Sequence, residues 1–180
     1  MKSLIPLALA AFMIPGLLVA QDKRFDSSPV EQFDLSRYLG GWFEIARFDH
    51  SFERGLDNVT GEYLLRDDGK IDVINSGWKD GKYQVAEGKA KQPEPLDDPA
   101  HLKVSFFLFF YSDYNVMMLD DNYQIALVGS KSPGYLWILS RTPAVSTDVL
   151  DAVLKEASDR GYDTSRLIWV DQDMNKSIAL

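Results

Sequence analysis

The chain has 180 residues, 46% of them apolar, and it carries a formal net charge of −8 at neutral pH and no cysteine. An acidic surface repels nucleic acid and anionic lipid head groups at long range, so we expect no nucleic-acid partner. The lack of cysteine excludes disulfides, thiolate catalysis and iron–sulfur clusters, and the fold must therefore be stable through core packing alone.

Residues 1–20 have the pattern of a secretory signal peptide. Lys2 supplies a positive start, the stretch from Leu4 to Val19 is almost wholly apolar, and small residues end it at Ala20. Two prolines and a glycine interrupt this stretch, which is also short for a membrane span. The sequence therefore predicts an exported protein whose folded part begins later.

Residues 21–33 form a polar lead-in, after which residues 34–38 can form one helical turn. Eight segments typical of strands follow at short intervals, at 42–48, 59–65, 71–78, 83–90, 102–107, 114–119, 124–129 and 135–141. Their connections are rich in Asp, Asn, Gly and Pro, the residues of hairpin turns. No intervening stretch is long and periodic enough for a crossover helix, so the strands should be antiparallel neighbours.

One helix should follow, capped by Ser146 or Thr147 and ended by Gly161, with its apolar face against the outside of the sheet. Residues 166–170 then have the pattern of a short ninth strand, and residues 172–180 form a polar tail that we expect to be loose. Eight up-and-down strands close into a barrel that holds side chains or one small ligand. We therefore predict an all-β fold: an eight-stranded antiparallel up-and-down β-barrel with a C-terminal helix and a short ninth strand, over residues 34–171.

Two motifs mark the ends of the barrel strands. Gly40-x-Trp42 opens the first strand and Arg141 ends the eighth. A guanidinium can stack on an indole and stays charged, so this pair can close one end of the barrel. Together with the helix and short strand that follow, these motifs resemble the lipocalin family. The family's middle signature, usually Thr-Asp-Tyr, corresponds here to Asp121-Asn122-Tyr123, and the resemblance thus implies a barrel floor of Gly40, Trp42, Tyr123 and Arg141.

Several segments are similar to the bacterial lipocalin subgroup, which consists of outer-membrane lipoproteins; they are residues 42–50, 52–56, 102–107, 114–116 and 135–143. The resemblance implies binding of fatty acids or lysophospholipids in the cell envelope, often as a homodimer. It also implies a periplasmic location, associated with the outer membrane. Gln21 stands where the subgroup has its lipidated cysteine, so either this member is soluble or Gln21 replaces a natural Cys.

The cavity should be lined by alternate residues, with Trp42 taken as inward-facing. The predicted ligand contacts are Ala46, Phe48, Val104, Phe106, Tyr114, Val116, Met118, Leu127, Trp137 and Leu139. Each buried methylene contributes about 0.8 kcal/mol, so an acyl chain can bind without bond-making, a cofactor or a metal. Arg47, Arg54 and Lys131 lie nearer the mouth and could contact a head group.

Glu44 shares the inward side of Trp42 under this alternation. It then needs a cation such as Arg141; if a bulge reverses the alternation, Glu44 is instead a surface carboxylate. Glu44 is also the one strong acid–base candidate if the barrel were a lipid-modifying enzyme.

The segment after Ser105 contains more aromatic residues than one face of a strand can bury. The residues Phe107, Leu108, Phe109, Phe110 and Tyr111 either pack into the core or form an apolar lip at the mouth. Such a lip would contact a membrane, gate the cavity or form a dimer face. We refer to these five residues as the lip.

Three alternatives to a lipid carrier remain at this stage. A haem or pigment carrier could use His50 as an iron ligand, an enzyme could use Glu44, and a dimerisation module could have a filled barrel. His50 and His101 should lie at opposite ends, which argues against a shared metal site. Asp171-x-Asp173-x-Asn175 begins like a calcium loop, but Lys176 occupies the required glycine position.

Overall fold

The computed structural model describes residues 25–107 and 109–176, so the expected signal peptide, Gln21 and Leu108 lie outside the described residues. The helices are α1 (Leu35–Tyr38), α2 (Thr147–Asp159), the 3₁₀ turn η1 (Thr164–Arg166) and α3 (Asp173–Lys176). The strands are β1 (Gly40–Phe48), β2 (Asp57–Leu65), β3 (Ile71–Lys79), β4 (Lys82–Lys91), β5 (His101–Phe107), β6 (Phe110–Leu119), β7 (Ile125–Gly129), β8 (Leu136–Ser140) and β9 (Leu167–Trp169). In the described part of the chain, no helix is long and apolar enough to cross a membrane.

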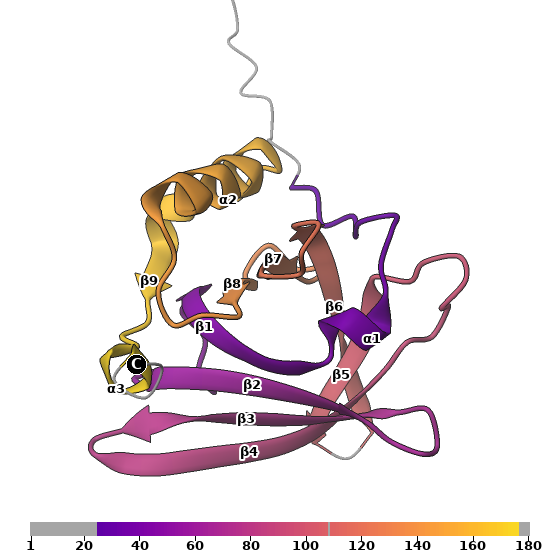
Figure 1. Ribbon diagram of the computed structural model, residues 1–180, viewed down its shortest axis with the longest axis horizontal. Helices are drawn as coiled ribbons and strands as arrows, with labels where there is room; N and C mark the ends of the chain where they lie inside the picture. Colours follow the sequence, from indigo (N-terminus) through magenta and orange to yellow (C-terminus); the bar gives the residue numbers. More distant parts are fainter. Residues whose placement is uncertain (1–24, 108, 177–180) are drawn as a thin grey trace, which may run out of the picture.

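The sheet closes on itself. The strand order is β2-β3-β4-β5-β6-β7-β8-β1-β9, and β1 also pairs with β2, so that eight strands form a barrel and β9 adds to β1 on the outside. Every strand pair is antiparallel. The predicted fold class is therefore confirmed. Figure 1 shows α1 at the start of β1 and α2 on the outer side of the barrel, above β7 and β8.

Two bulges change which side chains face the interior. The pairing of β1 with β8 shifts between Glu44 and Ala46, and the pairing of β6 with β7 shifts between Val116 and Met118. One extra residue in a strand moves all later side chains to the opposite face. Strict alternation, which the sequence-based prediction assumed, is therefore wrong for the second halves of β1 and β6.

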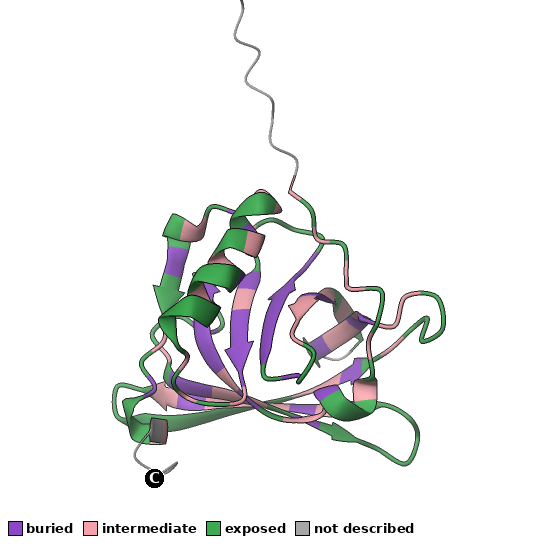
Figure 2. Cartoon of the chain, turned by 45° about the horizontal axis from the view of Figure 1, so that its top comes forward, coloured by how far each residue is buried: buried purple, intermediate pink, exposed green. Residues whose placement is uncertain are grey.

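The apolar side chains form two cores. One lies inside the barrel around Trp42 and Tyr38, and the other lies between the barrel and α2 around Phe48 and Val153. Val153 and Ala157 are the buried residues of α2, and Asp148 lies in its first turn, where the helix dipole favours a carboxylate. Figure 2 shows exposed residues along the outer side of α2 and buried residues on the strands beneath it.

The expected loose tail is instead docked over residues 171–175. The Gln172 side chain, 2% exposed, donates to the carbonyls of Glu44 (2.8 Å) and Val59 (2.9 Å). The Asn58 backbone N–H donates to the Asp171 carbonyl at 2.6 Å. Residues 171–175 dock here because the pairing of β1 with β2 stops at Phe43 and Thr60, which leaves the carbonyls of the next residues, Glu44 and Val59, in need of donors.

Candidate functional site

Arg141 closes one end of the barrel. Its guanidinium lies 3.8 Å from the centroid of the Trp42 ring. It also donates hydrogen bonds to the backbone carbonyls of Arg37, Tyr38, Leu39, Gly41 and Tyr123 at 2.7–3.3 Å. Gly40 has a φ of 92°, a left-handed conformation that favours glycine. The four residues expected at the floor thus lie together.

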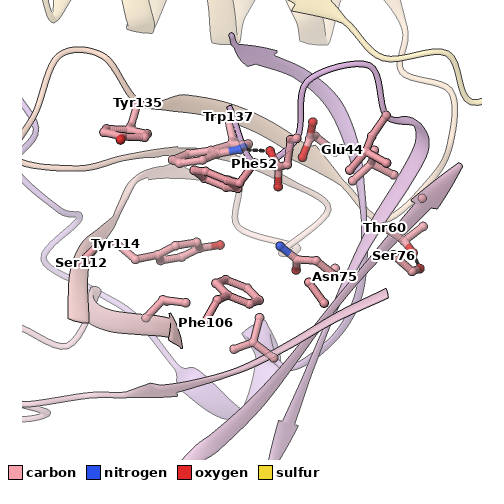
Figure 3. Close-up of a pocket in the computed structure, with 18 of the residues that line it drawn as sticks. Glu44, Phe52, Thr60, Asn75, Ser76, Phe106, Ser112, Tyr114, Tyr135 and Trp137 are labelled. Atoms are coloured by element: carbon pink, nitrogen blue, oxygen red, sulfur yellow. Dashed lines mark hydrogen bonds between the residues drawn. The ribbon is translucent and has the colours of Figure 1, made fainter. Parts of the chain in front are cut away.

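Above this floor the barrel contains a cavity of about 930 Å³. Five of the predicted ligand contacts line it: Val104, Phe106, Tyr114, Trp137 and Leu139. The lining also includes residues of the β1–β2 and β7–β8 connections, together with Phe107 at the end of β5 and Phe110 at the start of β6, so these parts of the chain surround the mouth. Figure 3 shows Trp137, Tyr135 and Phe52 on one side of the cavity, with Thr60, Asn75 and Ser76 on another.

The other five predicted contacts do not line the cavity; they are Ala46, Phe48, Val116, Met118 and Leu127. Val116 is buried in the core near the floor. The other four belong to the core beneath α2, because the bulges turn Ala46, Phe48 and Met118 outward, and Met118 pairs with Leu127. All five residues of β7 are buried, so its sequence contains no alternation from which the inward side could be read.

Polar residues of β2, β3 and β4 form a wall that the sequence reasoning missed. Thr60, Asn75, Ser76 and Gln84 line the cavity, and the hydroxyls of Thr60 and Ser76 are 2.9 Å apart. Extending the alternation upward from Tyr63 and Val73 would have found part of this wall. The cavity therefore has an apolar side and a polar side.

A buried ionic cluster lies beside this wall. Glu44 is 4% exposed and its partner is Arg47 rather than Arg141, with Arg47 Nη1 2.7 Å from Glu44 Oε1. Arg47 Nη2 donates to the carbonyls of Glu53 (2.8 Å) and Leu56 (3.1 Å). The bulge in β1 brings Arg47 inward, so this residue is buried and does not lie free at the mouth as expected.

Glu53 comes from the β1–β2 connection and completes the cluster. It is 5% exposed, and its Oε2 accepts a hydrogen bond from Trp137 Nε1 at 3.1 Å. Burial, followed by the nearby Glu53 carboxylate, raises the pKa of Glu44 to about 8, although Arg47 opposes this shift. A hydrogen bond to Glu53 also favours the protonated form. At neutral pH the Glu44 carboxyl group is therefore protonated.

His50 lies behind the cluster. Its ring stacks on Phe52 with centroids 4.0 Å apart, and its Nε2 is 3.1 Å from Glu53 Oε2. Neither ring nitrogen has a hydrogen-bond partner in the described structure. His50 does not line the cavity.

Three tyrosine hydroxyls meet near the floor. The Tyr114 hydroxyl is 2.6 Å from that of Tyr38 and 2.9 Å from that of Tyr63. Burial raises the pKa of all three phenols, which therefore remain neutral. Tyr63 and Tyr114 line the cavity, so its deepest part is apolar with neutral hydroxyl groups.

The described residues of the lip are mostly exposed. Phe107, Phe109 and Phe110 are 66%, 74% and 64% exposed. Phe110 packs against the other two, with ring centroids 6.3 and 5.2 Å apart, while Lys91 lies over the Tyr111 ring. Phe107 and Phe110 also line the cavity, so the lip is continuous with its interior.

Among the described residues, no group of three or more His, Asp or Glu side chains could hold a metal ion. His101 lies away from His50, on β5, where its Nε2 is 2.8 Å from Asp113 Oδ1. The cavity lining offers hydrophobic surface, hydroxyl groups and three carboxyl groups, those of Glu44, Glu53 and Asp113.

The comparisons with known proteins agree with this architecture. The model of the lipocalin-like domain matches residues 33–172. The chain is 48% identical over 171 residues to the outer membrane lipoprotein Blc of Escherichia coli K12, covering 94% of this chain and 96% of that protein. It is 38% identical to temperature-induced lipocalin-1 of Arabidopsis thaliana, covering 77% and 78% of the two chains.

Among solved structures, insecticyanin from the tobacco hornworm Manduca sexta superposes with a TM-score of 0.68 at 26% identity, covering 81% of this chain and 84% of that chain. The domain match spans most of the sequence, including the floor and the docked C-terminal segment. The expected resemblance is therefore confirmed: this chain belongs to the lipocalin family, whose members bind or transport small hydrophobic ligands and are generally not enzymes.

Proposed function

We propose that the protein binds a single-chain lipid, a fatty acid or lysophospholipid, and stores or transports it in the cell envelope without bond-making. The observation that carries this proposal is the cavity of about 930 Å³, closed at one end by Arg141 and open at the other. This volume lies in the range typical of small-molecule sites. Each methylene that enters contributes about 0.8 kcal/mol, so a long chain binds tightly through burial.

We further propose that Val104, Phe106, Tyr114, Trp137 and Leu139 contact the acyl chain. These residues come from three strands, β5, β6 and β8, and face the same space. Lys131 and Arg54 also line the cavity, toward the loops, and are more than 60% exposed. Arg54 pairs with Asp49 and Lys131 lies 3.7 Å from Asp113, so a phosphate at the mouth would compete with these two carboxylates.

The lip supports transfer between the cavity and a lipid surface. Phe107, Phe109 and Phe110 are exposed at the mouth, and Phe107 and Phe110 also line the cavity, so an acyl chain can leave a bilayer without crossing water. The net charge of −8 disfavours anionic bilayers and favours a zwitterionic surface. Similarity to an outer membrane lipoprotein supports a location in the envelope. A homodimer through the lip is the competing outcome.

A pigment carrier with an iron ligand at His50 gains no support, because His50 stacks behind Phe52 and does not line the cavity.

The lipid proposal is tested by titrating the protein with a fluorescent fatty acid and displacing it with lysophospholipid. Val104→Trp fills the cavity and should abolish binding. Leu64→Trp, on the outside of β2, is the matched control and should retain it. Equal binding by both variants, with both folded, would contradict the proposal.

A further inference from the structure

The ionic cluster in the cavity wall lacks one positive charge. Glu44 and Glu53 both line the cavity and are at most 5% exposed. Among the described residues, the basic side chains that face these carboxyl groups are Arg47, which donates a hydrogen bond to Glu44, and His50, whose Nε2 lies 3.1 Å from Glu53 Oε2 without a hydrogen bond. A buried carboxylate is costly unless a proton or a cation neutralises it. Arg47 can balance one ionised carboxyl group, and the second is balanced either by the proton that Glu44 holds in the empty cavity or by a further cation.

Aromatic rings surround the cavity side of Glu53. Trp137 donates its indole N–H to Glu53, and Tyr135 stacks on Trp137 with centroids 5.9 Å apart. Phe52 adds a third ring, and all three rings line the cavity. Figure 3 shows them together next to the carboxyl group that accepts the Trp137 bond. Aromatic faces attract ammonium groups, and a neighbouring carboxylate supplies the counter-charge.

The other cations of the cavity have partners elsewhere. Arg54 pairs with Asp49 at 2.8 Å, and Lys79 donates to the Arg54 carbonyl at 2.8 Å. Lys131 lies 3.7 Å from Asp113. None of these three forms an ion pair with Glu44 or Glu53 in the described structure. A ligand carboxylate placed at this wall would meet like charge, whereas an ammonium would meet opposite charge.

We propose that Glu53, with Phe52, Tyr135 and Trp137, binds the ammonium group of a cationic or zwitterionic amphiphile whose chain fills the cavity. This inference rests on the proposed lipid-binding function and names the head-group chemistry. Glu44 provides a second negative charge when it is needed. Its carboxyl group holds a proton in the empty cavity and can release that proton when an ammonium binds. The shared chemistry is a primary or quaternary ammonium, carried by a simple alkylamine or by an amino lysophospholipid.

The test compares ligands that share one dodecyl-length chain and differ in the head group. Dodecylamine and dodecyltrimethylammonium carry a cation, monolauroylglycerol is neutral and laurate is an anion. Isothermal titration at neutral pH should rank the two cations first, by on the order of tenfold over the neutral ligand, and laurate last. Lauroyl lysophosphatidylethanolamine is then compared with dodecylamine, which identifies the preferred source of the ammonium, and with lauroyl lysophosphatidylglycerol, which shows whether the ammonium of a lysophospholipid is recognised.

Two variants locate the effect. Glu53→Gln removes the charge, and its amide oxygen can still accept the Trp137 bond; it should remove the preference for cations while monolauroylglycerol binds as before. Asp113→Asn removes a carboxylate from another part of the lining, where Asp113 already has Lys103 at 3.3 Å. This control should keep the preference for cations, which excludes a general effect of cavity charge.

The outcomes separate the two proposals. Equal affinity for all head groups would overturn the ammonium site and leave the lipid carrier intact. A preference for cations that survives in Glu53→Gln would also overturn the assignment. Binding of none of the ligands by the folded wild-type protein would instead refute the proposed function itself. Retained binding of monolauroylglycerol by Glu53→Gln shows that this variant is folded.

Discussion

The raised pKa of Glu44 predicts a measurable pH dependence of stability. The pKa is about 8 in the folded chain, against an ordinary value of 4.5, because the carboxyl group is buried beside Glu53. The folded state therefore keeps a proton that the unfolded chain releases. Glu44 contributes stability that is fully present below the unfolded pKa and is lost as the pH rises through the folded pKa.

Glu44→Gln isolates this effect. The amide cannot titrate, and its oxygen can still accept the bond from Arg47 Nη1, which is 2.7 Å long in the wild type. Between roughly pH 5 and pH 7.5, the free energy of unfolding of the wild type should fall relative to that of the variant by about 1.4 kcal/mol per pH unit. The free energy of unfolding of the variant, relative to that of the wild type, should therefore increase toward alkaline pH.

The assay is urea unfolding followed by circular dichroism at a series of pH values. The quantity of interest is the difference between variant and wild type, because other titrating groups cancel in it. Glu62→Gln, an exposed residue of β2, is the control and should give a flat difference. Parallel curves for Glu44→Gln and the wild type would refute the raised pKa of Glu44.

Three further variants, two single and one double, test the floor, the docked C-terminal segment and the lip. Arg141→Lys loses the planar stack on Trp42 and most of the hydrogen bonds to backbone carbonyls. It should lower the free energy of unfolding, measured by urea titration, by about 2–3 kcal/mol. An unchanged unfolding midpoint would contradict the floor assignment. Gln172→Ala leaves two buried carbonyls without their donor and should cost about 1–3 kcal/mol by the same assay. Its failure to destabilise would show that the segment is not docked. Phe107→Ser with Phe109→Ser should weaken co-sedimentation with zwitterionic vesicles while leaving stability unchanged, because both side chains are largely exposed; unchanged co-sedimentation would assign the lip to another role.

The barrel could be predicted because its signals are local. Hairpin turns between short apolar segments set the strands, and the absence of a helical stretch between them makes neighbours antiparallel. Trp42 and Arg141 could be paired because each stands at the end of a strand at the same end of the barrel. Their separation in sequence does not matter once the strand count is known.

The inner lining could be predicted only in part, because bulges leave no clear signal in the sequence. The segment from Ile45 to Phe48 is buried on both faces, one against the cavity wall and one against α2, so its pattern looks the same with or without an extra residue. Arg47 was therefore expected near the mouth, and the pairing of Glu44 with Arg47 was missed.

The docked tail shows a second limit. Gln172 and Asn175 are polar, and polar residues near a chain end usually indicate a loose segment. Gln172 and Asn175 donate to backbone carbonyls, among them those of Glu44 and Asn58. The sequence does not reveal that these carbonyls lack a partner within the sheet. Such docking depends on where β1 and β2 diverge, a feature of the folded barrel alone.

The central claim, that the cavity holds a single-chain lipid, is tested most directly by native mass spectrometry of the protein exported with its own N-terminal segment into a bacterial envelope. The account predicts an added mass that matches one fatty acid or lysophospholipid and that is absent from Val104→Trp but present in Leu64→Trp. A bare protein mass that stays unchanged after addition of fatty acid and lysophospholipid would contradict it.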